Sequence, residues 1–250
     1  MVSVSDQSAT ARPGTRAVGP AVMSGGSLYT GQGAYIFLWC ATARDLSTDA
    51  DGDPSYVIDE SARTARAVYM RGLRENVELQ SSSGVPWQWR RILVSAKGLP
   101  LTFTTTQQAQ LYLEDTTGYR RLVSEVLASD RATLTNVLFR GSYSIDWSDY
   151  FTAKVDNSRF TVMYDKVRSV ASGNESGVLR RHTLWHPFNK SLVYNDDEVG
   201  DSVSPSHFST LGKAGMGDVY VVDIFQPRSG ATSSDQLIFQ PQSTLYWHER

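Results

Sequence analysis

Arginine and tryptophan residues are concentrated between residues 63 and 97. Aromatic rings stack on any nucleobase and guanidinium groups bind phosphates, so this combination is typical of surfaces that hold single-stranded nucleic acid. If residues 87–96 form a strand, Trp87, Trp89 and Arg91 share one face of it. The residues also suit an alternative, in which the Trp rings fill the core and the Arg residues cap a sheet edge or make salt bridges between subunits. The segment contains Trp87 and Trp89 together with Arg63, Arg66, Arg71, Arg74, Arg90, Arg91 and Lys97.

A metal-binding pattern is present in part in the acidic segment DADGDPSYVIDE. Asp49, Asp51, Asp53 and Glu60 occupy positions 1, 3, 5 and 12 of a calcium-binding EF-hand loop. Position 6 of that loop requires glycine for a sharp turn, and here it is Pro54. The pattern therefore favours a solvated acidic loop over a calcium site.

Catalytic motifs are missing from the sequence. It contains no G-x-S-x-G nucleophile motif, no G-x-x-x-x-G-K-[ST] phosphate loop and no H-E-x-x-H zinc motif. His182 and His186 share one face of a strand, but no third ligand is near them in the sequence. We therefore expect no enzymatic activity, no cofactor and no metal site.

The composition limits the range of partners. The 250 residues carry a formal net charge of −2, which leaves no overall basic footprint, so any binding to nucleic acid must be local. The single cysteine, Cys40, lies in an apolar run and is expected to be a buried hydrophobic residue. No signal peptide is visible, and the longest apolar run, Ala34–Ala43, is too short to span a bilayer, so we expect no membrane association.

Strand patterns recur along the chain after residue 30. Short apolar or alternating runs bounded by glycine, proline and polar residues are typical of strands in an all-β protein. The segment around Pro187 is expected to bend. The sequence predicts eight strands: Ala34–Ala43, Ala65–Leu79, Trp87–Ala96, Leu134–Phe139, Arg159–Val170, Val178–Tyr194, Met216–Phe225 and Gln236–Trp247.

A single helix is expected over Thr117–Asp130, where apolar residues recur at helical spacing. The polar composition of residues 1–30 predicts a flexible N-terminal arm, and residues 31–250 are expected to form one domain. Because strands and helices do not alternate, we predict a single eight-stranded jelly roll of the viral capsid type, with long loops and one short inserted helix.

Four segments resemble the capsid proteins of genomoviruses, which are related to the coat proteins of geminiviruses. They are VYMRGLRENVELQSSSGVPWQWRRILVSAKG, RFTVMYDKVRSVASGN, WHPFNKSLVYNDDEVGD and GDVYVVDIF, and the resemblance covers most of residues 33–250. It implies a jelly-roll coat protein that assembles from copies of itself into a small icosahedral shell and packages circular single-stranded DNA. Such proteins usually begin with a strongly basic arm that also serves nuclear entry, whereas residues 1–30 contain only Arg12 and Arg16.

The expected partners follow from this resemblance: other copies of the chain and single-stranded viral DNA, with the protein located in the virion and, during assembly, in the host nucleus. We expect the loops Tyr143–Phe151 and Trp185–Phe188 to contact neighbouring copies, and Asp196–Glu198 to meet basic residues of a neighbour. The candidate DNA-binding residues are Arg12, Arg16, Arg63, Arg66, Trp87, Trp89, Arg90 and Arg91.

A different class of function also fits the composition. Six Trp and twelve Tyr would suit a carbohydrate-binding, lectin-like β-sandwich, because exposed aromatic rings stack on sugars. A cupin-type enzyme on the same architecture needs clustered histidine ligands, which the spacing of the four His does not supply.

Overall fold

The computed structural model describes residues 1–9, 14–26, 34–48, 56, 62–99 and 110–249. Strands dominate this part of the chain, and it contains one α-helix, α1 (Ala128–Leu138). The long strands are β4 (Tyr35–Cys40), β5 (Ala67–Ser81), β6 (Trp87–Ala96), β9 (Thr161–Val170), β10 (Leu179–Val193), β13 (Asp218–Pro227) and β14 (Gln236–His248). The shorter strands are β1 (Ser3–Ser5), β2 (Ala17–Val18), β3 (Ala21–Ser24), β7 (Leu113–Asp115), β8 (Gly118–Val123), β11 (Asp197–Val199) and β12 (Ser202–Ser204).

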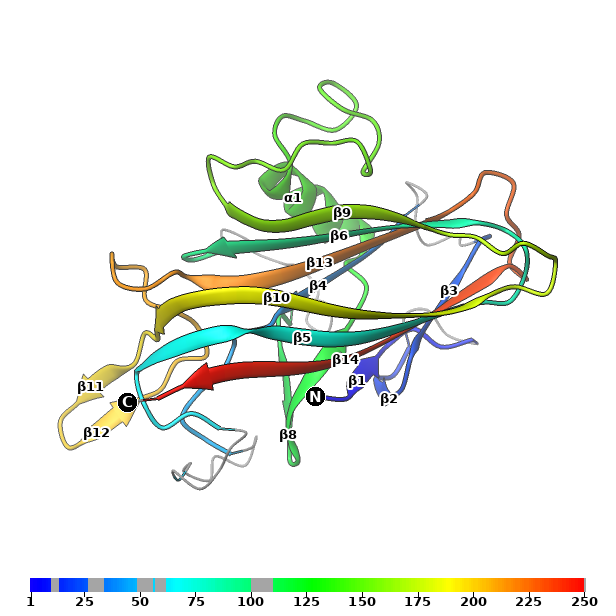
Figure 1. Ribbon diagram of the computed structural model, residues 1–250. Coiled ribbons are helices and arrows are strands. Elements are labelled where there is room, and N and C mark those ends of the chain that lie inside the picture. Colours follow the sequence, from blue (N-terminus) through cyan, green and yellow to red (C-terminus); the bar gives the residue numbers. More distant parts are fainter. Residues whose placement is uncertain (10–13, 27–33, 49–55, 57–61, 100–109, 250) are drawn as a thin grey trace.

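The long strands form two antiparallel sheets that pack face to face (Figure 1). One sheet has the order β4-β13-β6-β9 and the other the order β10-β5-β14-β3. Aromatic side chains from both sheets meet between them: Phe37 of β4 stacks on Phe239 of β14, with ring centroids 6.1 Å apart. Trp89 of β6 also contacts Phe239, at 6.4 Å. The protein is therefore an all-β sandwich with an aromatic core.

The two sheets differ in how they are covered. Almost every residue of β4, β6 and β13 is buried, because their outer face lies under α1 and the segment that follows it. In β5, buried and exposed residues alternate, because the outer face of its sheet is open to solvent. Strands buried on both sides read as continuous apolar runs, whereas half-exposed strands alternate. The sandwich thus has one covered and one open outer face.

Residues 117–138 differ from the prediction. Gly118–Val123 is a strand, β8, that pairs in parallel with β1, and the helix begins only at Ala128. Arg121, Leu122 and Val123 are all buried, so both faces of β8 are covered and its apolar residues imitate helical spacing. The expected strand Leu134–Phe139 falls within α1 and its C-cap, where Leu134 and Leu138 lie one turn apart on the buried side.

The first thirty residues also differ from the prediction of a flexible arm. Their described part contains β1, β2 and β3, and β3 pairs with β14 at the end of a main sheet. Val4, Ala21 and Met23 are buried, so this segment contributes apolar side chains to the fold. The polar composition of this segment predicted disorder, although its few apolar residues are placed so that they pack in the core. Arg12 lies outside the described residues.

The other seven expected strands are confirmed, most closely Trp87–Ala96, which coincides with β6. The bend expected near Pro187 is present: the register of β10 against β5 shifts between Pro187 and Lys190, and Asn189 has a φ of 50°. Trp87–Ala96 was recognisable because its apolar run is bounded by Pro86 and Gly98, and β5 because its apolar and polar residues alternate over most of its length.

Candidate nucleic-acid interface

Five of the expected DNA-binding residues are in the core. The exposed fraction is 1% or less for Arg63, Trp87, Trp89 and Arg91, and 4% for Arg90. A buried ring cannot stack on a base, and a buried guanidinium cannot reach a phosphate without local unfolding. The prediction is wrong for these five residues. The Trp rings fill the core, as the alternative expected, whereas the three Arg side chains form ion pairs within the chain.

Arg91 belongs to a charged network between the two sheets. Its guanidinium contacts Asp223 of β13 through two hydrogen bonds of 2.7 and 2.9 Å, and it also pairs with Glu75 of β5. Arg121 of β8 bridges the same two carboxylates, at 3.0 Å to each. Trp89 donates its indole N–H to Asp223 at 2.8 Å. Two arginines thus neutralise two carboxylates, and the network links both sheets.

The network shifts the pKa values of its neighbours. Burial raises the pKa of Glu75, but the charges of Arg91 and Arg121 outweigh this effect and lower it to about 2. His186 of β10 is buried nearby, and burial together with the charge of Arg91 lowers its pKa to about 4. Glu75 is therefore ionised and His186 neutral over the neutral pH range.

Arg90 and Arg63 hold loops in place. Arg90 contacts both carboxylate oxygens of Asp165 at 2.7 and 2.8 Å, and donates to the backbone oxygens of Tyr150 and Ala153. Arg63 makes two hydrogen bonds of 2.6 and 2.7 Å to Asp196. Asp196 is therefore buried against a residue of its own chain, not available to a neighbour as expected.

Two of the expected residues lie nearer the surface. Arg66 is exposed, with its Nε donating to the backbone oxygen of Tyr194 at 3.3 Å. Arg16 is half-buried and donates to the side chain of Gln110. A role in DNA binding remains a prediction for both.

The open outer face of the sheet β10-β5-β14 carries a different set of aromatic and basic residues. Trp185, Tyr246 and Tyr69 are 49%, 42% and 37% exposed. The Trp185 and Tyr246 rings meet edge to face, with centroids 5.8 Å apart. We call the following set the aromatic–arginine face: Tyr69, Arg71, Arg74, Arg181, Trp185 and Tyr246.

Gly72 of β5 allows the Trp185 ring to lie against the strand. A Cβ at this position would be 2.8 Å from Cζ2 of Trp185 and 2.5 Å from the backbone oxygen of His186. Exposed residues alternate on either side of Gly72 but change phase at it, so that Arg71 and Arg74 point outward together. The sequence pattern could not predict this face, because a strict period of two places Arg71 and Arg74 on opposite sides of the strand.

The three arginines of this face differ in their partners. Arg181 forms an ion pair with Glu78 at 2.7 Å, and Arg71 donates to Asn189 at 2.9 Å. Arg74 pairs with Trp185 and Thr244 in the sheet register, and its side chain makes no hydrogen bond or ion pair with any residue the structure describes. Its guanidinium is the one on this face best placed to bind a ligand.

An open pocket of about 380 Å³ continues the same face along the strands. Its lining is rich in side-chain amides and hydrogen-bonding groups, which suits a polar ligand. The lining residues are Asn76, Val77, Glu78, Arg181, His182, Thr183, Gln240 and Gln242.

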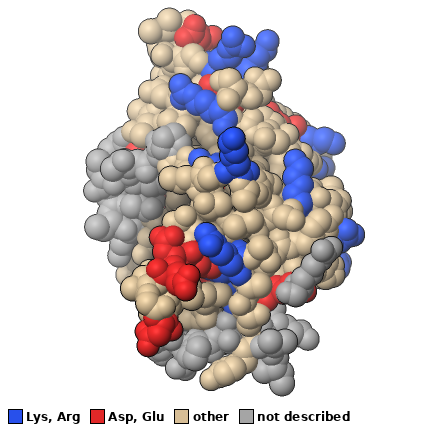
Figure 2. Space-filling view, turned by 90° about the vertical axis from the view of Figure 1, so that its left-hand side faces the viewer, with Lys and Arg blue, Asp and Glu red and all other residues tan. Residues whose placement is uncertain are grey.

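Charge is unevenly distributed at the end of the sandwich that carries the hairpin β11–β12. Figure 2 shows this end: Lys and Arg side chains spread over its upper and right-hand parts, and acidic side chains gather at the lower left. Asp197 and Glu198 of the hairpin and Asp201 of its turn are all exposed. The overall charge near zero therefore conceals an acidic cluster at one side of this end, next to an area in which basic side chains predominate.

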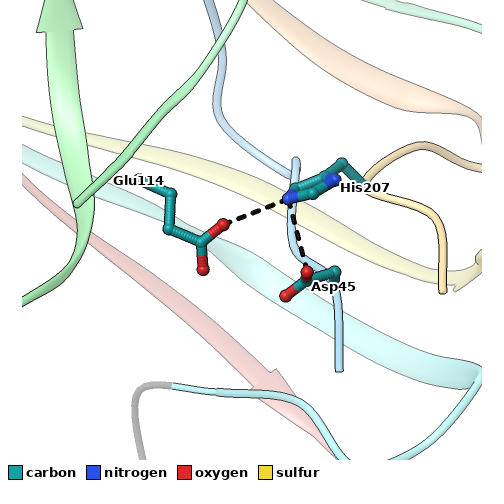
Figure 3. A group of neighbouring side chains, drawn as sticks. All are labelled: Asp45, Glu114 and His207. Atoms are coloured by element: carbon teal, nitrogen blue, oxygen red, sulfur yellow. Dashed lines mark hydrogen bonds and ion pairs between the residues drawn. The ribbon is translucent and has the colours of Figure 1, made fainter. Parts of the chain in front are cut away.

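Three residues that the sequence analysis did not single out come together near the same end (Figure 3). His207 Nε2 lies 3.2 Å from Glu114 Oε2 and 3.5 Å from Asp45 Oδ2. Glu114 belongs to β7, Asp45 follows β4 and His207 precedes β13. Such donors could hold a metal ion, and their wide separation in the sequence left no motif to find. The acidic pattern Asp49–Glu60 has its four aspartate and glutamate positions outside the described residues.

No protein-family model matches the chain, and no curated protein matches it. In the part of the chain that the structure describes, no helix is both long and apolar enough to cross a bilayer.

Proposed function

We propose that the protein is a coat protein that assembles from copies of itself into a closed shell around single-stranded DNA, located in the virion and, during assembly, in the host nucleus. The observation that supports this proposal is the exposure of large apolar side chains at several separate places. Ile145 and Leu211 are 84% and 74% exposed, and Val199 and Leu179 are 58% and 52% exposed. These residues lie in four separate segments of the chain, and a shell subunit needs contacts on several sides, whereas a dimer needs only one.

The strand order supports a jelly roll as the finer description of the sandwich. From β3 to β6 and from β9 to β14, successive strands of the two main sheets alternate between them, whereas β6 and β9 pair within one sheet. The early strand β4 pairs with the late strand β13, as a Greek-key connection requires. Jelly rolls combine such connections and are common in viral capsids and in lectins.

The aromatic–arginine face is the surface that we assign to DNA. Trp185 and Tyr246 offer rings for base stacking, and Arg74 offers a guanidinium without a partner among the described residues. This chemistry binds single strands without sequence preference, because every base has a π-face and every nucleotide a phosphate. We thus assign to this face the DNA contacts that the sequence predicted for Trp87, Trp89, Arg90 and Arg91.

Electron microscopy and sedimentation of the purified protein test the assembly. We expect closed particles of uniform size, and we expect the double variant Ile145→Ser, Leu211→Ser to remain folded but to form fewer particles. Asn157→Ser, at another exposed position, is the matched control and should assemble like the wild type. A protein that stays monomeric at every concentration contradicts the proposal.

A carbohydrate-binding function is the second candidate, because the open pocket on the same sheet is lined by Asn76, Gln240 and Gln242. Amide side chains both donate and accept hydrogen bonds, which suits sugar hydroxyls. Binding of the monomeric protein to a glycan array, lost in Gln242→Ala, would favour this function. Closed particles without glycan binding favour the coat protein.

A further inference from the structure

We propose that Asp45, Glu114 and His207 form a binding site for a divalent transition-metal ion with the ligand preferences of Zn²⁺. The ion would join three segments distant in the sequence: the residues after β4, the short strand β7 and the loop before β13. This goes beyond the proposed function, which assigns no metal ion to the protein.

The distances between the donor atoms fit one ion. Zinc binds imidazole nitrogen and carboxylate oxygen at about 2.0–2.2 Å, so two ligands of one ion lie about 3.0–3.5 Å apart at angles between octahedral and tetrahedral. His207 Nε2 is 3.2 Å from Glu114 Oε2 and 3.5 Å from Asp45 Oδ2. All three donor atoms lie within 4.8 Å of one another. Only small movements would bring them to coordination distance, and a fourth position would be left for water.

The carboxylate of Glu114 has unused capacity. Its side chain is 9% exposed, and its Oε1 is buried with no hydrogen-bond partner among the described residues. In Figure 3 the carboxylates of Glu114 and Asp45 both point toward the His207 ring. Two carboxylates that converge on one imidazole nitrogen leave one acceptor poorly satisfied, because that nitrogen carries at most one proton. A cation at the centre satisfies all three groups.

The surrounding residues hold the ligands in this orientation. Asp45 Oδ1 accepts hydrogen bonds from Tyr119 Oη at 3.0 Å and from the backbone and hydroxyl of Ser47 at 2.9 and 2.6 Å. These bonds direct its other oxygen, Oδ2, toward His207. The Tyr112 ring stacks on His207, with centroids 4.2 Å apart and planes at 20°, which fixes the plane of the imidazole. Hydrogen-bonded and packed ligands of this kind are typical of metal sites.

The mixed donor set indicates the class of metal. Imidazole favours zinc and its first-row neighbours over Mg²⁺ and Ca²⁺, which prefer oxygen ligands throughout. The competing explanation is a metal-free ion pair, in which protonated His207 bridges the two carboxylates. The two explanations differ in what the protein does when zinc is added at neutral pH.

Isothermal titration and thermal unfolding of the EDTA-treated full chain distinguish them. We expect one Zn²⁺ per chain with an increase in Tm, and no comparable effect of Mg²⁺. His207→Gln and the nearly isosteric Glu114→Gln should each weaken zinc binding by about tenfold or more. His248→Gln, at an exposed histidine, is the matched control and should bind zinc like the wild type. The proposal is overturned if the wild type does not bind zinc, or if His207→Gln binds it equally well.

Cobalt provides a measurement that needs no variant to fold. Co²⁺ bound by nitrogen and oxygen ligands in the wild-type protein should give a visible absorption spectrum that one equivalent of Zn²⁺ removes. A spectrum that is the same as that of Co²⁺ in buffer would contradict the site even if both variants proved unstable.

Discussion

At the scale of single residues, the side chains around Trp89 show what alternation in a sequence can and cannot predict. The expectation that Trp87, Trp89 and Arg91 share one face of a strand agrees with their side chains, which point between the sheets. The assignment of that face to DNA was wrong, because the second sheet covers it. Whether a strand face is buried depends on residues distant in the sequence. Here they include Glu75 of β5 and Ser243 of β14, which no local pattern links to Arg91.

Removal of Arg91 should destabilise the protein strongly. Arg91→Met leaves Glu75 and Asp223 buried with Arg121 as their remaining cationic partner. Breaking a buried charge network on one side costs about 3–5 kcal/mol of unfolding free energy. Urea unfolding measures this loss, and Arg74→Met, at an exposed arginine, should change the free energy by less than about 0.5 kcal/mol. Equal effects of the two substitutions would contradict the structural role of Arg91.

His186 should make the stability fall in acid. Its pKa is about 4 in the folded protein against 6.5 for a free histidine, so the unfolded chain binds more protons between these values. The free energy of unfolding from this group therefore decreases as the pH falls from 6.5 toward 4. A pKa that is lower by one in the folded protein than in the unfolded chain corresponds to about 1.4 kcal/mol. Glu75 continues the loss below pH 4.5, because its pKa is lowered to about 2.

Comparison with His186→Phe isolates this contribution. Asp218 and Glu125 act in the opposite direction, because burial raises their pKa values to about 6 and about 7. They are present in both proteins and cancel in the difference. The wild type should lose stability relative to His186→Phe between pH 6.5 and 4. A constant difference over this range would show that His186 does not titrate as described.

At the scale of elements, residues 117–138 show where the spacing of apolar residues fails to predict secondary structure. The strand β8 is buried on both faces, so its apolar residues have no period of two. The helix α1 packs against the sheet with Leu134 and Leu138 but lacks a side-chain N-cap, so its start had no signal in the sequence. In contrast, β5, β6 and β10 were predicted well because they are long and have clear ends. Their pairing into two sheets depends on contacts distant in the sequence.

The outer face of β10, β5 and β14 should bind single-stranded DNA through Trp185 and Arg74. Trp185→Ala removes a stacking platform, which is worth about 1–3 kcal/mol per base, and should weaken binding to a labelled thymidine oligonucleotide by at least about fivefold. Arg74→Gln should reduce the slope of log affinity against log salt by about 0.7, the value for one lost phosphate contact. Fluorescence anisotropy at several salt concentrations measures both effects.

The variant Arg228→Gln is a control for nonspecific electrostatic attraction between the oligonucleotide and basic side chains elsewhere on the surface. Arg228 is exposed in the loop after β13, away from the aromatic–arginine face. Arg228→Gln should leave oligonucleotide binding and its salt slope unchanged. If Arg228→Gln weakens binding as much as Arg74→Gln, the attraction is spread over the surface and the assigned face is wrong.

At the scale of the whole molecule, the predicted contact loops differ in which of their residues are exposed on the surface. The sequence indicated an all-β chain and loops suited to contacts between copies, and Ile145 within Tyr143–Phe151 is indeed strongly exposed. In the other expected contact loop, Trp185 is exposed but Phe188 is buried in the core between the sheets. Which residues of a loop remain outside depends on the packing of the complete fold.

The acidic hairpin β11–β12 should make assembly depend on ionic strength. Asp197 and Glu198 are exposed, and this end of the molecule also carries Lys and Arg side chains in a separate area, so identical copies can pair acidic with basic areas (Figure 2). Each exposed pair contributes only about 0–1 kcal/mol, but a shell repeats the pair in every subunit contact. Salt shortens the screening length from about 10 Å at 0.1 M to about 3 Å at 1 M, so particles should dissociate more readily as salt rises.

Light scattering of variants at several salt concentrations measures this contribution. The double variant Asp197→Asn, Glu198→Gln should assemble less at low salt and lose the dependence on salt. Glu175→Gln, at another exposed acidic position, is the control and should behave like the wild type. Wild-type particles whose stability does not change with salt would exclude an electrostatic contribution from this hairpin and leave the apolar contacts as the basis of assembly.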